Sequence, residues 1–135
     1  MGFFDILKSI FTPSDSLRIR AGLNQNDLVD IKKKWEEIEM LMKLGKPSSF
    51  KSAILEADKL LDHVLKLYGY LGNSMGDRMK SLPRDSYSRE FFDDMWGAHK
   101  LRNEMAHNIM YEVMDFEARK AIGQYKNVLQ VLRVL

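Results

Sequence analysis

The sequence has 135 residues, of which 45% are hydrophobic and 30% charged, as in a globular domain that buries one hydrophobic core. It contains no cysteine, which excludes disulfide bonds, thiolate chemistry and cysteine-bound zinc. The formal net charge of +2 permits a nucleic-acid partner without requiring one, and no apolar stretch approaches the roughly 20 residues of a transmembrane helix. We expect a cytoplasmic protein without a membrane partner.

Residues 1–25 differ in composition from the rest of the chain and form the first predicted unit, with residues 26–135 as the second. The first unit begins with an apolar cluster that predicts a short amphipathic helix ending at Pro13: Phe3, Phe4, Ile6, Leu7, Ile10 and Phe11. This stretch lacks the basic start and cleavage site of a signal peptide. We expect the helix to pack on its own domain or on a partner subunit, with a membrane-surface anchor as the alternative.

Two long amphipathic helices are predicted next, at residues 27–44 and 47–68. Gly45 is expected to close the first and Pro47 to begin the second. Their expected apolar faces are Leu28, Ile31, Trp35, Ile38 and Met42, then Phe50, Ala53, Ile54, Ala57, Leu60, Leu61, Val64 and Tyr68. We interpret Glu56, Asp58 and Asp62 of the second helix as a solvated face, because they lack the Glu-x-x-His partners of a di-iron bundle.

Two further long helices complete the chain. Residues 69–88 form a connection that includes a short helix at 74–82, and residues 91–111 form the third long helix, which we expect to fray at Asn108. The fourth starts near Asp115 and continues to the end of the chain. The expected apolar faces are Phe91, Met95, Ala98, Met105 and Ile109, then Ala118, Ala121, Tyr125, Val128, Leu132 and Leu135. These segments predict an all-α four-helix bundle, preceded by the extra N-terminal amphipathic helix.

Arg102 lies in the middle of the apolar stripe of the third long helix. A guanidinium group on an apolar face is costly unless another group pairs with it. His107 follows five residues later, which is about 140° around an ideal helix, so the two side chains do not stack. They can converge only through the reach of Arg102, a distorted helix end or a second copy of the chain.

Other candidate sites have simpler explanations. Lys32, Lys33 and Lys34 form either a solvated face or a weak phosphate-binding patch for nucleic acid. His99 and His107 lie four residues either side of Asn103, but two imidazoles and an amide are a thin set of ligands. We therefore expect no metal ion and no cofactor.

The hexapeptide RNEMAH at residues 102–107 resembles the motif of the HEPN family, in which Arg is followed after four to six residues by His, commonly with Asn directly after the Arg. The resemblance covers residues 27–135 and places the motif toward the end of the third of four helices. It implies a HEPN-type bundle that forms a homodimer or paired domains. Many members are metal-independent ribonucleases in which the motifs of two subunits face one cleft, and others bind nucleotides or act as assembly modules.

The resemblance implies that Arg102 and His107 are catalytic, supported by Asn103 and His99. Histidine titrates near neutrality and can move the proton of an RNA 2′-hydroxyl, while an arginine fork matches a phosphate that gains charge. The expected function is cleavage of single-stranded RNA in a toxin or defence setting, with an antitoxin or regulatory protein as a further partner. The alternatives are a non-catalytic HEPN-like module that binds nucleotide, RNA or protein, and a structural role in which Arg102 pairs with a carboxylate and His107 caps a helix.

Overall fold

The computed structural model describes residues 23–135, which form five helices. These are α3 (Gln25–Lys43), α4 (Pro47–Leu67), α5 (Met75–Lys80), α6 (Arg89–His107) and α7 (Asp115–Val131). No strand occurs within residues 23–135, so the all-α prediction is confirmed for this part of the chain. No helix in the same range is long and apolar enough to cross a lipid bilayer. The N-terminal helix predicted before Pro13 lies outside the described residues.

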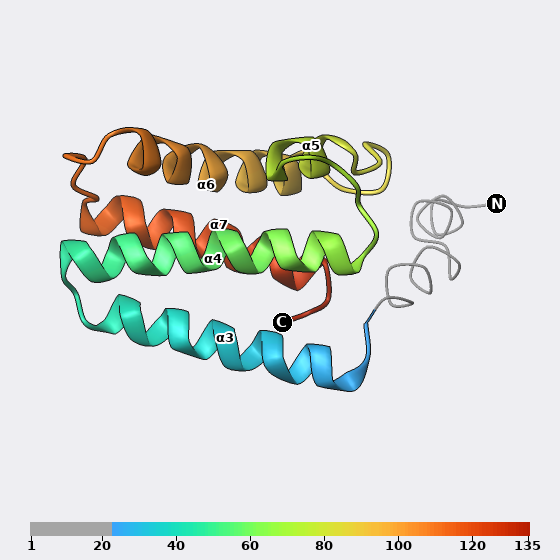
Figure 1. Cartoon of the computed structure of the whole chain (residues 1–135), viewed down its shortest axis with the longest axis horizontal. Coiled ribbons are helices and arrows are strands. Elements are labelled where there is room, and N and C mark those ends of the chain that lie inside the picture. The colour runs from blue at the N-terminus through green and yellow to red at the C-terminus, as the bar shows by residue number, and fades with distance from the viewer. Residues whose placement is uncertain (1–22) are drawn as a thin grey trace.

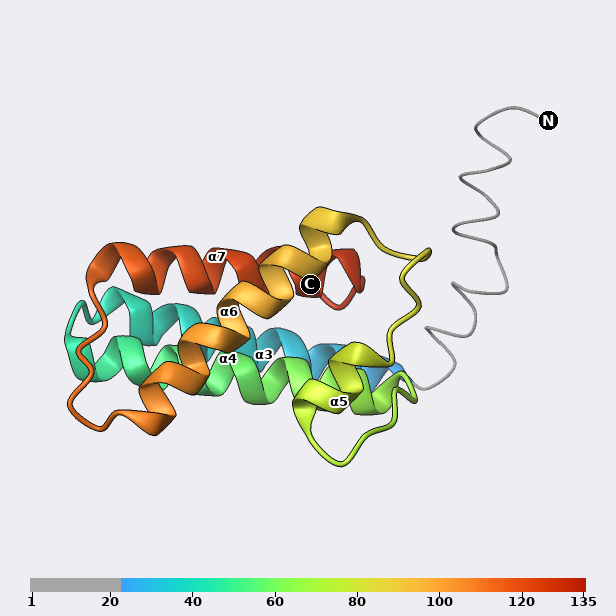
Figure 2. The same cartoon turned by 90° about the horizontal axis from the view of Figure 1, so that it is seen from above.

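The central element is α4, which contacts each of the other four helices. Figure 1 shows α4 and α7 in the middle of the bundle, with α3 on one side and α6 and α5 on the other. Seen from above, α6 crosses over α7 and α4 at an oblique angle, and α5 lies beside α4 (Figure 2). As a result, the side of α4 beneath α6 is internal to the bundle.

Local sequence features explain where most helices begin. The side chain of Asn24 accepts a hydrogen bond from the Asp27 amide, and the Asp27 side chain accepts one from the Asn24 amide, which makes a capping box at the start of α3. Ser74 and Ser88 cap α5 and α6 in the simpler way, each accepting from an amide three residues later. At the end of α3, Gly45 has a φ of +68°, as expected for a glycine just past a helix.

Two predicted helix ends are wrong. The third long helix stops at His107 and not at residue 111, because Asn108 adopts an extended conformation. Ile109 consequently leaves the apolar stripe and is 89% exposed. The last helix ends at Val131, short of the chain end, and Arg133 two residues later has a positive φ of 62°.

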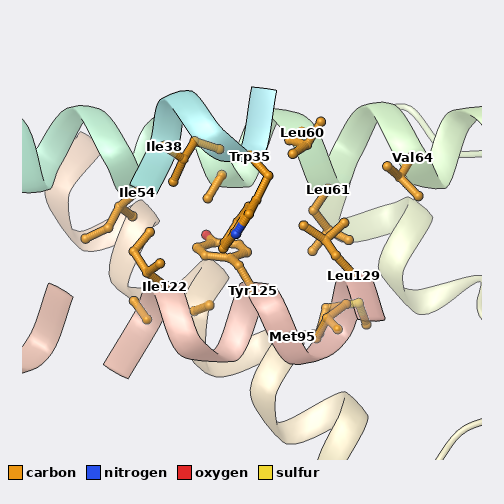
Figure 3. Close-up of a cluster of buried hydrophobic side chains, with 14 of the residues drawn as sticks. Trp35, Ile38, Ile54, Leu60, Leu61, Val64, Met95, Ile122, Tyr125 and Leu129 are labelled. Carbon is orange, nitrogen blue, oxygen red and sulfur yellow. The ribbon is translucent and has the colours of Figure 1, made fainter. Parts of the chain in front are cut away.

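The core gathers side chains from α3, α4, α6 and α7 (Figure 3). Most of the predicted apolar positions are buried, and Leu28, Met42, Tyr68 and Leu135 are partly buried against the cluster. Burying one large apolar side chain contributes about 1.5–3 kcal/mol, so this shared cluster is the main force that holds the bundle together. One member, Tyr125 of α7, is fully buried and carries a hydroxyl group that needs a hydrogen-bond partner in the interior.

Candidate functional site

The partner of the Tyr125 hydroxyl is Asp58 of α4, and this corrects the prediction that Asp58 lies on a solvated face. Asp58 is only 4% exposed. Its Oδ1 atom accepts hydrogen bonds from the Tyr125 hydroxyl at 2.7 Å and from His99 Nδ1 at 2.9 Å. Its Oδ2 atom lies 3.4 Å from Arg102 Nε. One carboxylate on α4 therefore joins α7 through Tyr125 and α6 through His99 and Arg102.

The helical spacing of α4 already indicates this burial. Asp58 lies four residues after Ile54 and three before Leu61, so it shares a helix face with two core residues. Counting charge alone grouped it with Glu56 and Asp62. The same grouping is inaccurate for those two as well, because both are half-buried and ion-paired, with Lys34 and Arg78 respectively.

The protons within the Asp58 cluster can be assigned from its hydrogen bonds. Burial, followed by the negative charge of Asp58, raises the pKa of Tyr125, so its phenol remains protonated and donates. Because a carboxylate oxygen only accepts, His99 donates from Nδ1 and keeps Nε2 for another partner. In this arrangement a buried carboxylate fixes the tautomer and orientation of His99, which is itself only 8% exposed.

Arg102 has found the partner that its position in the apolar stripe required. Its side chain is 35% exposed, so Asp58 holds one edge of the guanidinium while much of the group remains open to solvent. Arg102 Nη1 donates to the Asn103 side-chain oxygen at 3.1 Å. Asn103 thus contacts the guanidinium directly.

Arg102, Asn103 and His99 line one groove of about 530 Å³ between α4, α5 and α6. The groove is also lined by Lys59 and Lys80 and by the carboxylates of Asp58, Asp62 and Asp77, so three cations and three carboxylates share its walls. Two of the three cations, Lys59 and Lys80, are exposed. Among the predicted site residues, the fold brings Arg102, Asn103 and His99 together in this groove.

His107 lies outside this groove. It is exposed at the last position of α6, about 7.5 Å along the helix axis from Arg102 at 1.5 Å per residue. No hydrogen bond of the His107 side chain is seen within residues 23–135, and at this helix end the Asn108 amide donates to the Glu104 carbonyl. Within one chain, the histidine beside Arg102 is therefore His99.

The outer wall of the groove is α5, which a bidentate contact attaches to α4. Arg78 donates to both oxygens of Asp62, at 2.6 Å from Nε and 3.2 Å from Nη2, and to the Gly72 carbonyl at 2.7 Å. Burial alone would raise the pKa of Asp62, but the hydrogen bonds from Arg78 and Lys66 outweigh it and lower the pKa. The charged contact therefore defines one side of the groove.

The lysine patch on α3 does not join the groove. Lys34 Nζ lies 2.9 Å from Glu56 and 3.5 Å from Glu37, while Lys32 and Lys33 are exposed. Figure 1 shows α4 and α7 between α3 and α6.

The potential metal ligands within residues 23–135 do not cluster. No group of three or more His, Cys, Asp or Glu side chains in this range is placed to hold an ion.

Comparisons with family models, curated proteins and solved structures find no match for this chain. The resemblance to the HEPN family therefore rests on the RNEMAH motif and on its position near the end of a long helix in an all-helical domain.

Proposed function

We propose that this chain is a metal-independent endoribonuclease of the HEPN type that cleaves single-stranded RNA and assembles as a homodimer. The observation that carries the proposal is the placement of Arg102 and His99 on one buried carboxylate, in a groove open to solvent. Held in this way, a fixed cation and an oriented imidazole supply two of the functions that RNA cleavage without a metal requires.

The proposed reaction is an internal transfer at phosphorus. The RNA 2′-oxygen attacks the adjacent phosphorus, so a P–O2′ bond forms, the P–O5′ bond breaks, and a histidine accepts the 2′-hydroxyl proton. The departing 5′-oxygen takes a proton from a second acid or from water. Arg102 stabilises the charge that builds on the phosphoryl oxygens. The products are a 2′,3′-cyclic phosphate and a 5′-hydroxyl end.

Two histidines are candidates for the proton transfer. His99 lies in the same groove as Arg102, whereas His107 would act on the groove of a second copy, as the HEPN resemblance implies. A dimer would have an apolar surface to bury next to His107, since Ile109, Met110 and Phe116 are exposed in and after the α6–α7 connection.

The test is cleavage of single-stranded RNA in the presence of EDTA, with the end groups identified. Substitution of the acting histidine should lower the rate roughly 10²–10⁴-fold, through His107→Ala or His99→Asn, the latter keeping a donor for Asp58. Arg102→Ala should cost roughly 10²–10³-fold. His63→Ala, an exposed histidine on α4, is the matched control.

The comparison of these variants has a clear negative outcome. Equal cleavage by the wild type and all three variants would assign the activity to a contaminant and reject the proposal. DNA should not be cut, because it lacks the 2′-hydroxyl. Growth arrest on expression of the wild type, and its absence with the inactive variant, would test the toxin or defence setting in which an antitoxin or regulatory partner is expected.

A non-catalytic HEPN-like module is the second candidate. The observation in its favour is that His107 does not line the groove of its own chain, while His99 is also part of the network that ties α4, α6 and α7 together. For such a protein, the wild type and the His107→Ala variant would bind RNA or nucleotide with equal affinity, and both would leave RNA intact.

A further inference from the structure

A second cavity, of about 580 Å³, adjoins the groove that contains Arg102. It lies between α5, the connection that follows α5, and the first half of α6. Its lining combines three cations, Lys80, Arg84 and Arg89, with the three aromatic residues Tyr87, Phe92 and Trp96. Asp93 is the single carboxylate among the lining residues. Neither the RNEMAH motif nor the proposed reaction uses this surface.

The two cavities form one continuous surface, because Lys80 and Trp96 line both. The Trp96 ring contacts the His99 ring edge-on, with ring centroids 6.3 Å apart. A flexible ligand whose phosphate lies at Arg102 would therefore extend past Trp96 into the second cavity.

The aromatic side chains are supported from beneath and partly open above. Phe92 and Trp96 are half-exposed and lie one helical turn apart on the same face of α6, about 6 Å along the axis. Phe92 packs edge-on against Tyr87, which is buried, with ring centroids 6.1 Å apart. Rings held in this way provide surfaces on which nucleobases can stack.

The cations around these rings are available to a ligand. Arg84 and Lys80 are exposed and form no ion pair within residues 23–135. Arg89 makes one long contact to Asp93, at 3.8 Å, on a side chain that is almost fully exposed. Such an exposed ion pair contributes little to stability, so Arg89 can leave Asp93 and contact a phosphate at low cost in free energy.

We infer that this second cavity binds the nucleotides that flank the phosphate held at Arg102, by stacking bases on Phe92 and Trp96 and by contacting phosphates with Arg84 and Arg89. The ligand class is a single-stranded polynucleotide, because the bases of a duplex are stacked on one another and do not present their faces. The inference rests on the proposed function for the position of the scissile phosphate, but the binding itself does not require cleavage.

The experiment measures binding of a fluorescein-labelled 2′-O-methyl RNA of ten nucleotides, which cannot be cleaved by 2′-oxygen attack. Fluorescence anisotropy of the wild-type full-length chain should show saturable binding, and a duplex of the same length should bind much more weakly. Trp96→Leu, which keeps an apolar side chain but removes the ring face, should weaken binding roughly ten-fold. RNA binding should also change the tryptophan fluorescence of the wild type. This change should be absent in Trp96→Leu, because the other tryptophan, Trp35, is buried in the core.

The charge contribution is tested by a matched pair of double substitutions. Arg84→Gln with Arg89→Gln should reduce the slope of log affinity against log salt concentration by about 1.4, which is two phosphate contacts at about 0.7 each for a single strand. Lys32→Gln with Lys33→Gln removes the same charge from α3, on the opposite side of the bundle, and should change the slope much less. Circular-dichroism melting of each variant establishes that the fold is retained.

The outcomes separate this inference from the proposed function. Absence of wild-type binding, equal binding of the duplex, or equal effects of the two double substitutions would overturn the inference. Binding that depends on Trp96 and Arg84 together with no cleavage of ordinary RNA would sustain the inference and reject the ribonuclease. Cleavage with an unchanged KM in the Arg84→Gln, Arg89→Gln variant would support the ribonuclease and reject the inferred binding in the second cavity.

Discussion

Asp58 shows how one side chain can organise a whole site. Taking a carboxylate out of water is costly, and here the cost is offset by two hydrogen bonds and by the nearby charge of Arg102. The same contacts set the orientation of His99 and restrict Arg102. Asp58 therefore acts on the proposed chemistry as a positioning residue, through the two groups that would face the RNA.

Replacing Asp58 with Asn should destabilise the fold by about 3 kcal/mol, at the lower end of the cost of breaking a buried pair because Arg102 is partly exposed. The amide can keep an oxygen for Tyr125 and His99, which both donate to Oδ1, but its NH2 group then faces Arg102 and the paired negative charge is lost. Urea unfolding measures the loss. Glu56→Gln, which removes a more exposed carboxylate of the same helix, is the control and should cost much less. Equal losses of unfolding free energy in the two variants would show that the buried Asp58 cluster contributes no more to stability than a more exposed ion pair.

At the scale of single elements, α5 depends on its neighbours for its existence. Six residues are too few for a helix that is stable by itself. Its attachment consists of the buried side chain of Met79 and the contact between Arg78 and Asp62. Gly72 adds a close approach, because a Cβ atom at that position would lie 2.7 Å from the Arg78 amide nitrogen. Since α5 forms a wall of both cavities, a change in its attachment should alter both.

The Asp62 contact should make the stability of the fold depend on pH in the acid range. The pKa of Asp62 is lowered in the folded state, so its stabilising effect is complete above the unfolded-state pKa of about 4 and is lost as the pH falls through the lower folded-state pKa. Asp62→Asn should therefore reduce the unfolding free energy at pH 7 by about 1.5 kcal/mol.

The measurement compares denaturant unfolding of the wild type and Asp62→Asn at pH 7 and near pH 3. The difference between the two proteins should shrink at the lower pH, because the unfolded chain takes up a proton at Asp62 more readily than the folded chain does. Asp115→Asn, which removes an exposed pair with Arg119 on α7, should show little effect at either pH. A difference that stays constant from pH 7 to pH 3 would contradict the charge-based attachment of α5.

For the whole molecule, the proposed dimer requires a surface through which two copies could meet. The connection after α6 exposes Ile109, Met110 and Met114, and Phe116 of α7 is exposed beside it. Four exposed large apolar side chains within eight consecutive residues are a candidate surface for contact with a partner. The proposed dimer would bury it and bring His107 of each copy to an interface.

Light scattering at tens of micromolar should give the mass of a dimer, and Met110→Glu with Phe116→Glu should shift the mass toward that of a monomer. The introduced charges would have to be buried without partners in the interface, which is unfavourable. Val29→Glu, an exposed apolar residue on α3, is the control and should leave the mass unchanged. A monomeric mass for the wild type would reject the homodimer.

Deleting residues 1–13 should leave the bundle folded, since a full hydrophobic cluster is formed by residues 23–135. The thermal transition should remain cooperative, with some loss of dimer if the segment packs on a partner subunit. Loss of the transition would place this segment in the core. Co-sedimentation of the full-length chain with liposomes, lost on deletion, would support the membrane-surface alternative.

The sequence alone determined most of the secondary structure, because the causes are local. Pro47 and Gly45 mark a helix start and a helix end, and the spacing of Ile31, Trp35 and Ile38 defines a buried face, whatever the helix packs against. The requirement that Arg102 find a partner was also visible in the sequence, since a charge on an apolar stripe needs one wherever the chain folds.

Only the tertiary structure identified that partner and decided which histidine lies beside Arg102. The burial of Asp58 depends on α6 crossing over α4. This crossing brings Asp58 against His99 and Arg102, which lie 41 and 44 residues later in the chain. Likewise, His107 lies outside the groove because five residues of α6 separate it from Arg102, both along the axis and around the helix. A helical period shows which side chains share a face, but the environment of a charged group is set by the element that packs over it.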